Sequence, residues 1–205
     1  MKKVFFTLFV AAALWTVMFS PLTAPYVNFW YMMTASACVL SLLATLFSPG
    51  WWRNIRFTLS NILLGFAIAA ALWCVFWIGD KVSQLLFDFA RPQVDTIYGM
   101  KEGESPIVLT ILMLFLIGPA EEIFWRGYVQ REMSMHWNAN IGFAVTTAIY
   151  ALVHAGSCNF MLVMASLVAG FAWGALYRFF PKRFAAIVIS HALWDVAVFI
   201  WFPIM

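Results

Sequence analysis

Seven long apolar stretches alternate with short polar segments along the chain. A helix needs about 20 predominantly apolar residues to cross the hydrocarbon core of a bilayer. The stretches occupy residues 4–19, 27–47, 57–79, 106 onward, 141–154, 160–177 and 184–202. This pattern predicts an all-α fold, a polytopic membrane helix bundle of about seven transmembrane helices.

The segments between the stretches predict how the helices are joined. Residues 51–56 are aromatic and basic, which is typical of an interfacial anchor. In the polar segment 80–105 we expect a short interfacial helix over 82–90, followed by a loop. Gly118-Pro119 predicts a kink or break in the fourth span, and residues 127–140 read as a polar turn.

Composition supports a membrane protein. The 205 residues are 64% hydrophobic and 10% charged, whereas soluble domains average about 25% charged residues. No basic face for nucleic acid is visible, so we expect no nucleic-acid partner. Lys2-Lys3 and the apolar run after them resemble a signal peptide, but Leu22 is too large for the cleavage pattern. Because further spans follow, we expect an uncleaved first helix.

Basic residues predict the orientation in the membrane. Cytoplasmic loops carry an excess of Lys and Arg, and seven spans divide the bases nine to three. We therefore expect a cytoplasmic N-terminus and a C-terminus outside, even if Arg126 belongs to a site. The nine are Lys2, Lys3, Arg53, Arg56, Arg126, Arg131, Arg178, Lys182 and Arg183, and the three are Lys81, Arg91 and Lys101.

The chain divides by content into an N-terminal part, 1–105, and a C-terminal part, 106–205, which holds the candidate chemistry. Cys38, Cys74 and Cys158 are scattered singly, and we interpret them as small buried apolar residues. Cys158 follows closely after His154, which leaves a thiol nucleophile as an alternative.

The fourth span carries three charges within six residues, Glu121, Glu122 and Arg126. Each charge near a bilayer centre costs roughly 2.5–3.5 kcal/mol on insertion scales, so we expect a protein-lined or hydrated cavity. Glu122 and Arg126 are four residues apart in the favourable order for a helical ion pair, which leaves Glu121 unpaired.

Two further spans carry polar pairs with the same spacing. They are Tyr150 with His154, and His191 with Asp195. Residues four apart share a helix face, so each pair can point into the bundle. Hydrogen bonds between membrane helices yield only about 0.6 kcal/mol each, and seven polar residues on three spans exceed what helix adhesion needs. We therefore favour a function for them.

Hydrolysis fits one carboxylate, two imidazoles and a water. Glu121, helped by His154, would deprotonate water, and His191 with Asp195 would stabilise an oxyanion or protonate the leaving amine. The same side chains could instead bind Zn²⁺ through His154, His191 and a carboxylate. The chain contains no HExxH sequence, and spacing alone does not decide between these alternatives.

The three groups resemble the EExxxR, FxxxH and HxxxN/D motifs of the CPBP family, which includes CAAX prenyl proteases and bacteriocin-processing or self-immunity proteins. The resemblance implies a glutamate-dependent intramembrane endopeptidase without a metal cofactor. In it Glu121 would be the base with His154, while His191 and Asp195 would form the oxyanion side. Glu122 and Arg126 would give structural support.

The resemblance also implies a setting. The substrate would be a membrane-anchored protein or peptide, lipidated or C-terminally tagged, and the cavity would open to the cytoplasm from a bacterial inner membrane. Tyr150 stands where Phe is usual, so its hydroxyl needs a partner, and Asp195 stands where Asn is common, so it would orient His191. A non-catalytic membrane partner or immunity protein and a proton-relay transporter are the competing functions. The sequence does not reveal the oligomeric state.

Overall fold

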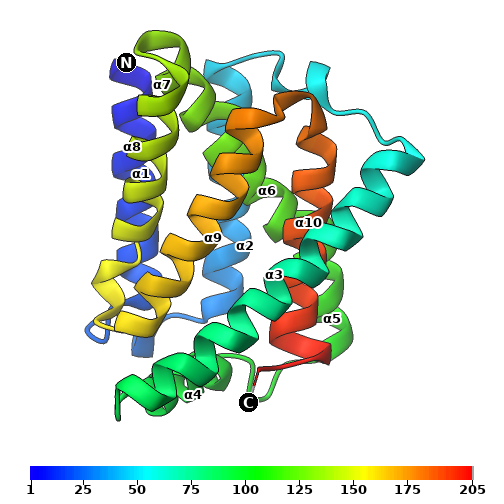
Figure 1. Ribbon diagram of the computed structural model, residues 1–205. Helices are drawn as coiled ribbons and strands as arrows, with labels where there is room; N and C mark the ends of the chain where they lie inside the picture. The colour runs from blue at the N-terminus through cyan, green and yellow to red at the C-terminus, as the bar shows by residue number, and fades with distance from the viewer. Residues whose placement is uncertain (205) are drawn as a thin grey trace.

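The computed structural model describes residues 1–204, apart from the side chains of residues 53 and 54. It is helical throughout, and residues 1–204 contain no strand. Seven helical stretches in this part of the chain are long and apolar enough to cross a membrane (Figure 1). The predicted all-α class and the number of spans are therefore confirmed.

The first three spans are single helices. They are α1 (Lys2–Phe19), α2 (Phe29–Phe47) and α3 (Leu59–Leu86), joined by the short turns η1 (Ala24–Tyr26) and η2 (Trp51–Asn54). Two of them begin at a residue whose side chain satisfies a free backbone N–H of the first turn. Asn28 accepts from the amide of Tyr31, and Thr58 accepts from that of Asn61.

The polar segment after α3 folds differently from the prediction. Helix α3 continues to Leu86, and the interfacial helix is α4 (Ala90–Gly99), so the helix expected over 82–90 is wrong. Helix α3 runs past its apolar stretch because Asp80 is buried and accepts from Gln84 one turn later. Pro92 lies in the first turn of α4, where its missing N–H costs little.

The fourth span is one continuous helical rod. It consists of α5 (Pro106–Leu112), the π-helical turn η3 (Met113–Ile117), α6 (Gly118–Glu122), the π-helical turn η4 (Ile123–Gln130) and α7 (Arg131–His136). The predicted break at Pro119 is wrong, and so is the predicted turn over 127–140, which starts only after His136. Wider π turns accommodate a proline, because they release the backbone bond that its ring blocks.

The last three spans follow with short connections. They are α8 (Ala139–Leu152), the turn η5 (Ala155–Ser157), α9 (Phe160–Phe179), the turn η6 (Pro181–Arg183), α10 (Phe184–Val196) and the π-helical turn η7 (Ala197–Trp201). Asn138 and Asn159 cap α8 and α9 by accepting from amides of the first turn.

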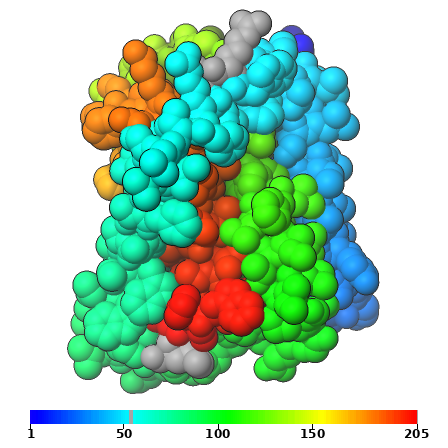
Figure 2. Space-filling view, turned by 90° about the vertical axis from the view of Figure 1, so that its right-hand side faces the viewer, coloured from blue at the N-terminus to red at the C-terminus, as the bar shows by residue number. Residues whose placement is uncertain are grey.

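Helix α10 lies at the centre of the bundle. Of its span, 67% is buried, whereas the other spans are 17–39% buried. Helix α10 packs along α3 on one side and against α6 on the other. Figure 2 shows α10 between α3 and the fourth span. A residue on α10 is therefore well placed to meet side chains from several helices.

The three cysteines lie at the surface, and the prediction that they are buried is wrong. Cys38, Cys74 and Cys158 are all exposed. Cys38 lies on α2 and Cys74 on α3, in spans whose outer sides carry many exposed Phe and Leu residues. In a membrane protein the outward face meets lipid, so a small apolar thiol fits there as well as in a core.

The bundle has two distinct ends. One end, at the top of Figure 1, carries the N-terminus and the connections α2–α3, α7–α8 and α9–α10. We name it the basic end, because most Lys and Arg residues lie there. The opposite end, named the α4 end, carries α4, the turns η1 and η5, and the C-terminal residues. Each span runs from one end to the other.

Candidate functional site

Glu122 and Arg126 form the ion pair that their spacing predicts. Arg126 Nη1 donates to Glu122 Oε1 over 2.8 Å, and the two side chains are 0% and 1% exposed. Breaking such a pair from one side leaves an uncompensated buried charge, which typically costs about 3–5 kcal/mol. The pair is therefore strongly coupled to the fold.

Arg126 also connects the fourth span to α9. Its Nη2 donates to the carbonyl oxygen of Gly170 over 3.2 Å, and its guanidinium lies 4.9 Å from the ring centre of Tyr150. A side chain at Gly170 would meet the Tyr150 ring, with a Cβ only 2.8 Å from Cδ1. Glycine at this position thus lets α9 approach the site closely enough for its backbone to bind Arg126.

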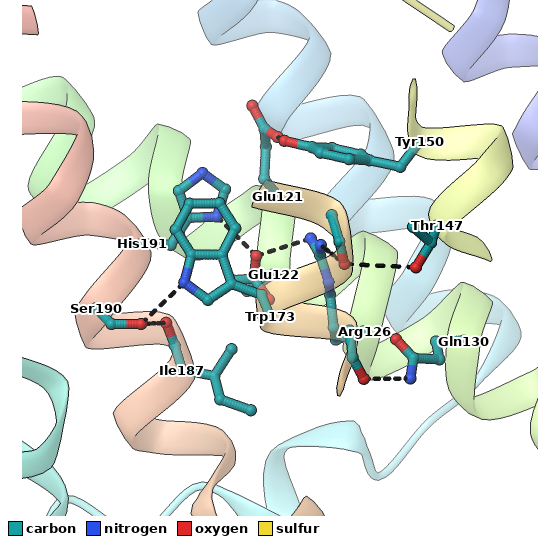
Figure 3. Close-up of polar contacts among 12 residues, drawn as sticks. Glu121, Glu122, Arg126, Gln130, Thr147, Tyr150, Trp173, Ile187, Ser190 and His191 are labelled. Atoms are coloured by element: carbon teal, nitrogen blue, oxygen red, sulfur yellow. Dashed lines mark hydrogen bonds and ion pairs between the residues drawn. The ribbon is translucent and has the colours of Figure 1, made fainter. Parts of the chain in front are cut away.

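The same oxygen of Glu122 binds the second candidate histidine. His191 Nδ1 lies 2.6 Å from Glu122 Oε1, so Arg126 and His191 share one carboxylate oxygen (Figure 3). The family resemblance assigns Glu122 to structural support. The structure adds a direct contact with His191, across 69 residues of sequence, which no local spacing indicates.

His191 is held on its face and on its far edge. The Trp173 indole stacks on the imidazole with ring centres 3.8 Å apart and planes at 13°. Trp173 is fixed in turn, because its Nε1–H donates to Ser190 Oγ over 3.1 Å. Asp195 Oδ1 lies 3.5 Å from His191 Nε2, which agrees with the predicted pairing one helical turn apart. Trp173 and Ser190 were not predicted, because an aromatic and a hydroxyl residue on apolar spans carry no distinctive signal.

Glu121 takes its hydrogen bond from α8. The hydroxyl of Tyr150 donates to Glu121 Oε2 over 3.0 Å. Tyr150 stands where Phe is usual, and its additional hydroxyl binds the Glu121 carboxylate, which has no partner within its own helix. A hydrogen bond to one oxygen fixes the orientation of the carboxylate while leaving lone pairs on the other oxygen.

His154 has both ring nitrogens engaged. Its Nδ1 lies 2.8 Å from the carbonyl oxygen of Tyr150, and its Nε2 accepts from Trp15 Nε1–H over 3.0 Å. Because an indole N–H only donates, Nε2 must be the unprotonated nitrogen and Nδ1 must carry the proton. His154 is thus connected to Glu121 through Tyr150. Trp15, which lies on α1 and is buried, was not predicted as part of the site.

One cavity brings the three motifs together. It has a volume of about 540 Å³, and its walls are mostly apolar. The side chains of the predicted site that line it are Glu121, Tyr150, His154, His191 and Asp195. Glu122 and Arg126 lie behind this lining and are buried. The expected convergence of spans four, five and seven on a shared pocket is therefore observed.

The zinc alternative depends on a set of three ligands. Residues 1–204 contain no group of three or more His, Cys, Asp or Glu side chains arranged to hold a metal ion. The nitrogens of His154 are engaged by Trp15 and Tyr150, and Nδ1 of His191 is engaged by Glu122. This arrangement does not fit a zinc site, and independence from metal stays a prediction.

Comparison with known families bears on these motifs directly. Residues 103–197 match the family model described as type II CAAX prenyl endopeptidase Rce1-like. This segment, just under half of the chain, is similar to the Rce1-like family. No curated protein and no solved structure matches the chain. The match includes all three motifs, so the CPBP resemblance is confirmed, and similarity to the Rce1-like family implies a CAAX intramembrane endopeptidase in an integral membrane protein.

The Rce1-like match leaves part of the site outside its limits. Helices α1 to α4 precede residue 103, yet Trp15 of α1 binds His154 and Asp80 of α3 lines the cavity. The Rce1-like segment therefore supplies the motif residues, while the N-terminal helices complete their surroundings.

Proposed function

We propose that this protein is a glutamic-type intramembrane endopeptidase that hydrolyses a peptide bond in a membrane-anchored protein. The observation that carries the proposal is the cavity in which Glu121, oriented by Tyr150, lies together with His191, which is backed by Glu122 and Asp195. The similarity of residues 103–197 to the Rce1-like family supports peptide hydrolysis as the reaction.

Glu121 acts as the general base. Tyr150 occupies Oε2, so the other carboxylate oxygen accepts a proton from a water molecule as that water attacks the scissile carbonyl carbon. The new C–O bond yields a tetrahedral intermediate with a negatively charged oxygen. When the C–N bond breaks, the protonated Glu121 returns the proton to the leaving amine, and the carboxylate is regenerated.

His191 stabilises the oxyanion. Its Nδ1–H is donated to Glu122, which fixes the ring and directs Nε2 toward Asp195. A proton on Nε2 is then available to the developing oxyanion, and Asp195 compensates the charge of the ring. Stacking on Trp173 prevents the imidazole from rotating, so the donor needs little reorganisation during the reaction.

His154 does not touch Glu121 directly and supports it through Tyr150. Its Nδ1–H holds the carbonyl of Tyr150, the residue whose hydroxyl orients Glu121. We therefore assign His154 to the base side of the site, in agreement with the role that the resemblance implies. The reaction so written needs no metal, because a carboxylate and an imidazole supply the base and the oxyanion donor.

Glu121→Gln tests the proposal. The amide keeps the shape of the side chain and removes the base, so peptide hydrolysis should fall by about 10²–10⁴-fold, the usual contribution of a general base. The measurement compares the chain ends of membrane proteins, by mass spectrometry, in cells that contain the native enzyme or the variant. Glu102→Gln, an exposed acid at the α4 end, is the matched control and should process normally. Equal processing by Glu121→Gln and the native enzyme would refute the glutamic mechanism.

A further inference from the structure

The cavity occupies only the half of the bundle that lies toward the α4 end. Each of several spans lines it with its α4-end portion alone. Helix α1 contributes its last residue, Phe19, helix α3 contributes residues from Val75 onward, and α9 contributes residues 160–169 of its first half. Helix α10 contributes residues from His191 onward. The base and the oxyanion donor are therefore reached from the α4 side of the membrane.

The two ends of the bundle differ strongly in charge. Without Arg126, the basic end carries eight Lys and Arg residues and one acid, Glu132. The α4 end carries three bases and five acids, which are Asp80, Asp88, Asp95, Glu102 and Glu104. All the connections are short, which is the condition under which the distribution of Lys and Arg determines orientation.

The bases at the α4 end are also engaged by the protein itself. Arg91 Nε donates to Asp95 over 2.9 Å, and Lys81 lies 3.7 Å from Asp80. Lys101 donates to the carbonyl oxygen of Phe199 over 2.6 Å. A base near an anionic membrane surface is attracted to that surface, and acids next to the base reduce the attraction. The charges therefore favour the basic end as the cytoplasmic end.

Two expectations from the sequence exclude each other in this geometry. A cytoplasmic N-terminus places the basic end inside, whereas cytoplasmic access to the site places the α4 end inside. We propose that the charge distribution decides: the cavity faces the non-cytoplasmic side, and the substrates are membrane-anchored proteins cut in the peptide segment next to the bilayer on that side. The cleavage part of this inference rests on the proposed function. The side of the membrane on which the cavity opens rests on the position of the cavity and on the distribution of charges.

The walls of the cavity fit such a substrate. Val82 and Leu86 of α3 and Val168 of α9 are large apolar residues that line the cavity and are not covered by other parts of the chain. The cavity thus borders the bilayer between these two helices. A peptide that leaves the outer half of the bilayer passes from lipid into an apolar chamber, where it meets Glu121, without crossing the basic end.

Cysteine labelling tests the orientation independently of activity. The native Cys38, Cys74 and Cys158 are replaced by Ala, and a single Cys is introduced as Glu102→Cys or Lys182→Cys, both at exposed positions on opposite ends. A membrane-impermeant maleimide should label Glu102→Cys in intact spheroplasts as fully as after permeabilisation. It should label Lys182→Cys only after permeabilisation. The reverse pattern overturns the inference and leaves the proposed protease chemistry intact.

The substrate class is tested by mapping new chain ends. Membrane proteins from cells with the native enzyme or with Glu121→Gln are compared by terminal-peptide mass spectrometry. Chain ends that depend on Glu121 should lie just outside the non-cytoplasmic end of a transmembrane anchor. If such ends lie on the cytoplasmic side, the inferred access is wrong. If no chain end depends on Glu121, the proposed function fails, and with it the substrate class, whereas the labelling result still stands.

Discussion

Glu121 and Glu122 are adjacent in sequence, yet their different surroundings indicate different roles. Glu122 is fully buried and binds Arg126 and His191 through one oxygen, while Glu121 lines the cavity and accepts from Tyr150. A residue that binds two cationic or donor groups in the core is part of the fold. A residue on a cavity wall is free to react with a substrate.

This contrast predicts opposite profiles for two matched variants. Glu122→Gln leaves Arg126 without its counter-charge, so we expect it to lower the free energy of unfolding by about 3–5 kcal/mol. Glu121→Gln should change stability by less than about 1 kcal/mol, because the amide oxygen can still accept from Tyr150, while hydrolysis should fall by about 10²–10⁴-fold. Thermal unfolding in detergent and a cleavage assay on both variants provide the measurement. Similar stability losses in the two variants would contradict the division of roles.

Trp15 is predicted to position His154. Trp15→Phe removes the N–H that binds Nε2 and keeps an aromatic ring, so His154 loses the bond that defines its tautomer and hydrolysis should fall about tenfold, as for a lost hydrogen bond of about 1.4 kcal/mol. The chain has three His residues, which makes ¹⁵N spectra of the imidazoles readily assigned. The Nε2 signal of His154 should shift away from its hydrogen-bonded position.

Trp125→Phe is the control for Trp15→Phe. Trp125 packs edge-to-face on Trp15 and is buried, but its Nε1 has no hydrogen-bond partner among the described residues. The control therefore removes the same atoms without breaking a bond, and the His154 signal should stay in place. An unchanged His154 signal in Trp15→Phe as well would show that the indole does not set the tautomer.

Metal removal is a further prediction at the scale of single residues. A zinc site that uses both His154 and His191 needs a free ring nitrogen on each, yet both nitrogens of His154 are engaged by Trp15 and Tyr150, and Nδ1 of His191 is engaged by Glu122. Hydrolysis should therefore be unchanged after the purified enzyme is dialysed against a zinc chelator. Loss of activity that Zn²⁺ restores would favour the zinc alternative.

The sequence predicts local pairs well and long-range partners poorly. Glu122 with Arg126 and His191 with Asp195 follow from helical spacing, and both are present. The contact of His191 with Glu122 and that of Trp15 with His154 join residues 69 and 139 positions apart. Such contacts depend on how whole helices pack, which a residue pattern does not encode.

At the scale of elements, the fourth span shows why boundaries are hard to predict. Gly118-Pro119 and the polar residues after Gly127 indicate a break and a turn, yet the helix continues to His136 through two π turns. Packing decides this outcome, because η4 is almost entirely buried against its neighbours. Tertiary contacts outweigh the local preferences of Gly and Pro.

Gly118→Ala is predicted to disturb the site through the contact between α6 and α10. A Cβ at Gly118 would lie 2.7 Å from the Cα of Ala192, which is backbone and cannot rotate away. The helices must separate, so stability should fall by about 1–3 kcal/mol, typical of overpacking, and the contact between Glu122 and His191 should weaken. Thermal unfolding and the cleavage assay measure both effects.

Gly79→Ala is the matched control for stability. Gly79 lies within α3, and a Cβ there meets no atom within 4 Å. Replacing a helical glycine by alanine in open space should raise stability by roughly 0.5–1 kcal/mol. If Gly118→Ala lowers stability while Gly79→Ala raises it, the loss of stability in Gly118→Ala comes from the close approach of α6 and α10. It does not come from the loss of a glycine as such. A neutral Gly118→Ala would contradict the tight approach.

At the scale of the whole molecule, the N-terminal helices and the Rce1-like segment form one body. Helix α3 packs along α10, Trp15 of α1 binds His154, and Trp30 of α2 donates to the carbonyl oxygen of Met100. The division into residues 1–105 and 106–205 describes where the motifs lie. The seven spans and their order follow from the apolar pattern, while the shape of the cavity depends on contacts between both parts.

The charge asymmetry of the whole molecule gives the last prediction. If eight bases against three determine the orientation, then Lys2→Gln and Lys3→Gln combined with Glu102→Lys and Glu104→Lys leave six against five. Nearly balanced ends should insert both ways, because orientation follows the excess of Lys and Arg near the spans. The probe is Thr96→Cys, an exposed position at the α4 end, in the cysteine-free background. Impermeant maleimide should then label only part of the molecules in intact spheroplasts. A control with Lys2→Arg and Lys3→Arg keeps the charges and should label fully. Full labelling of the balanced variant would show that the apolar spans, and not the charges, fix which side the cavity faces.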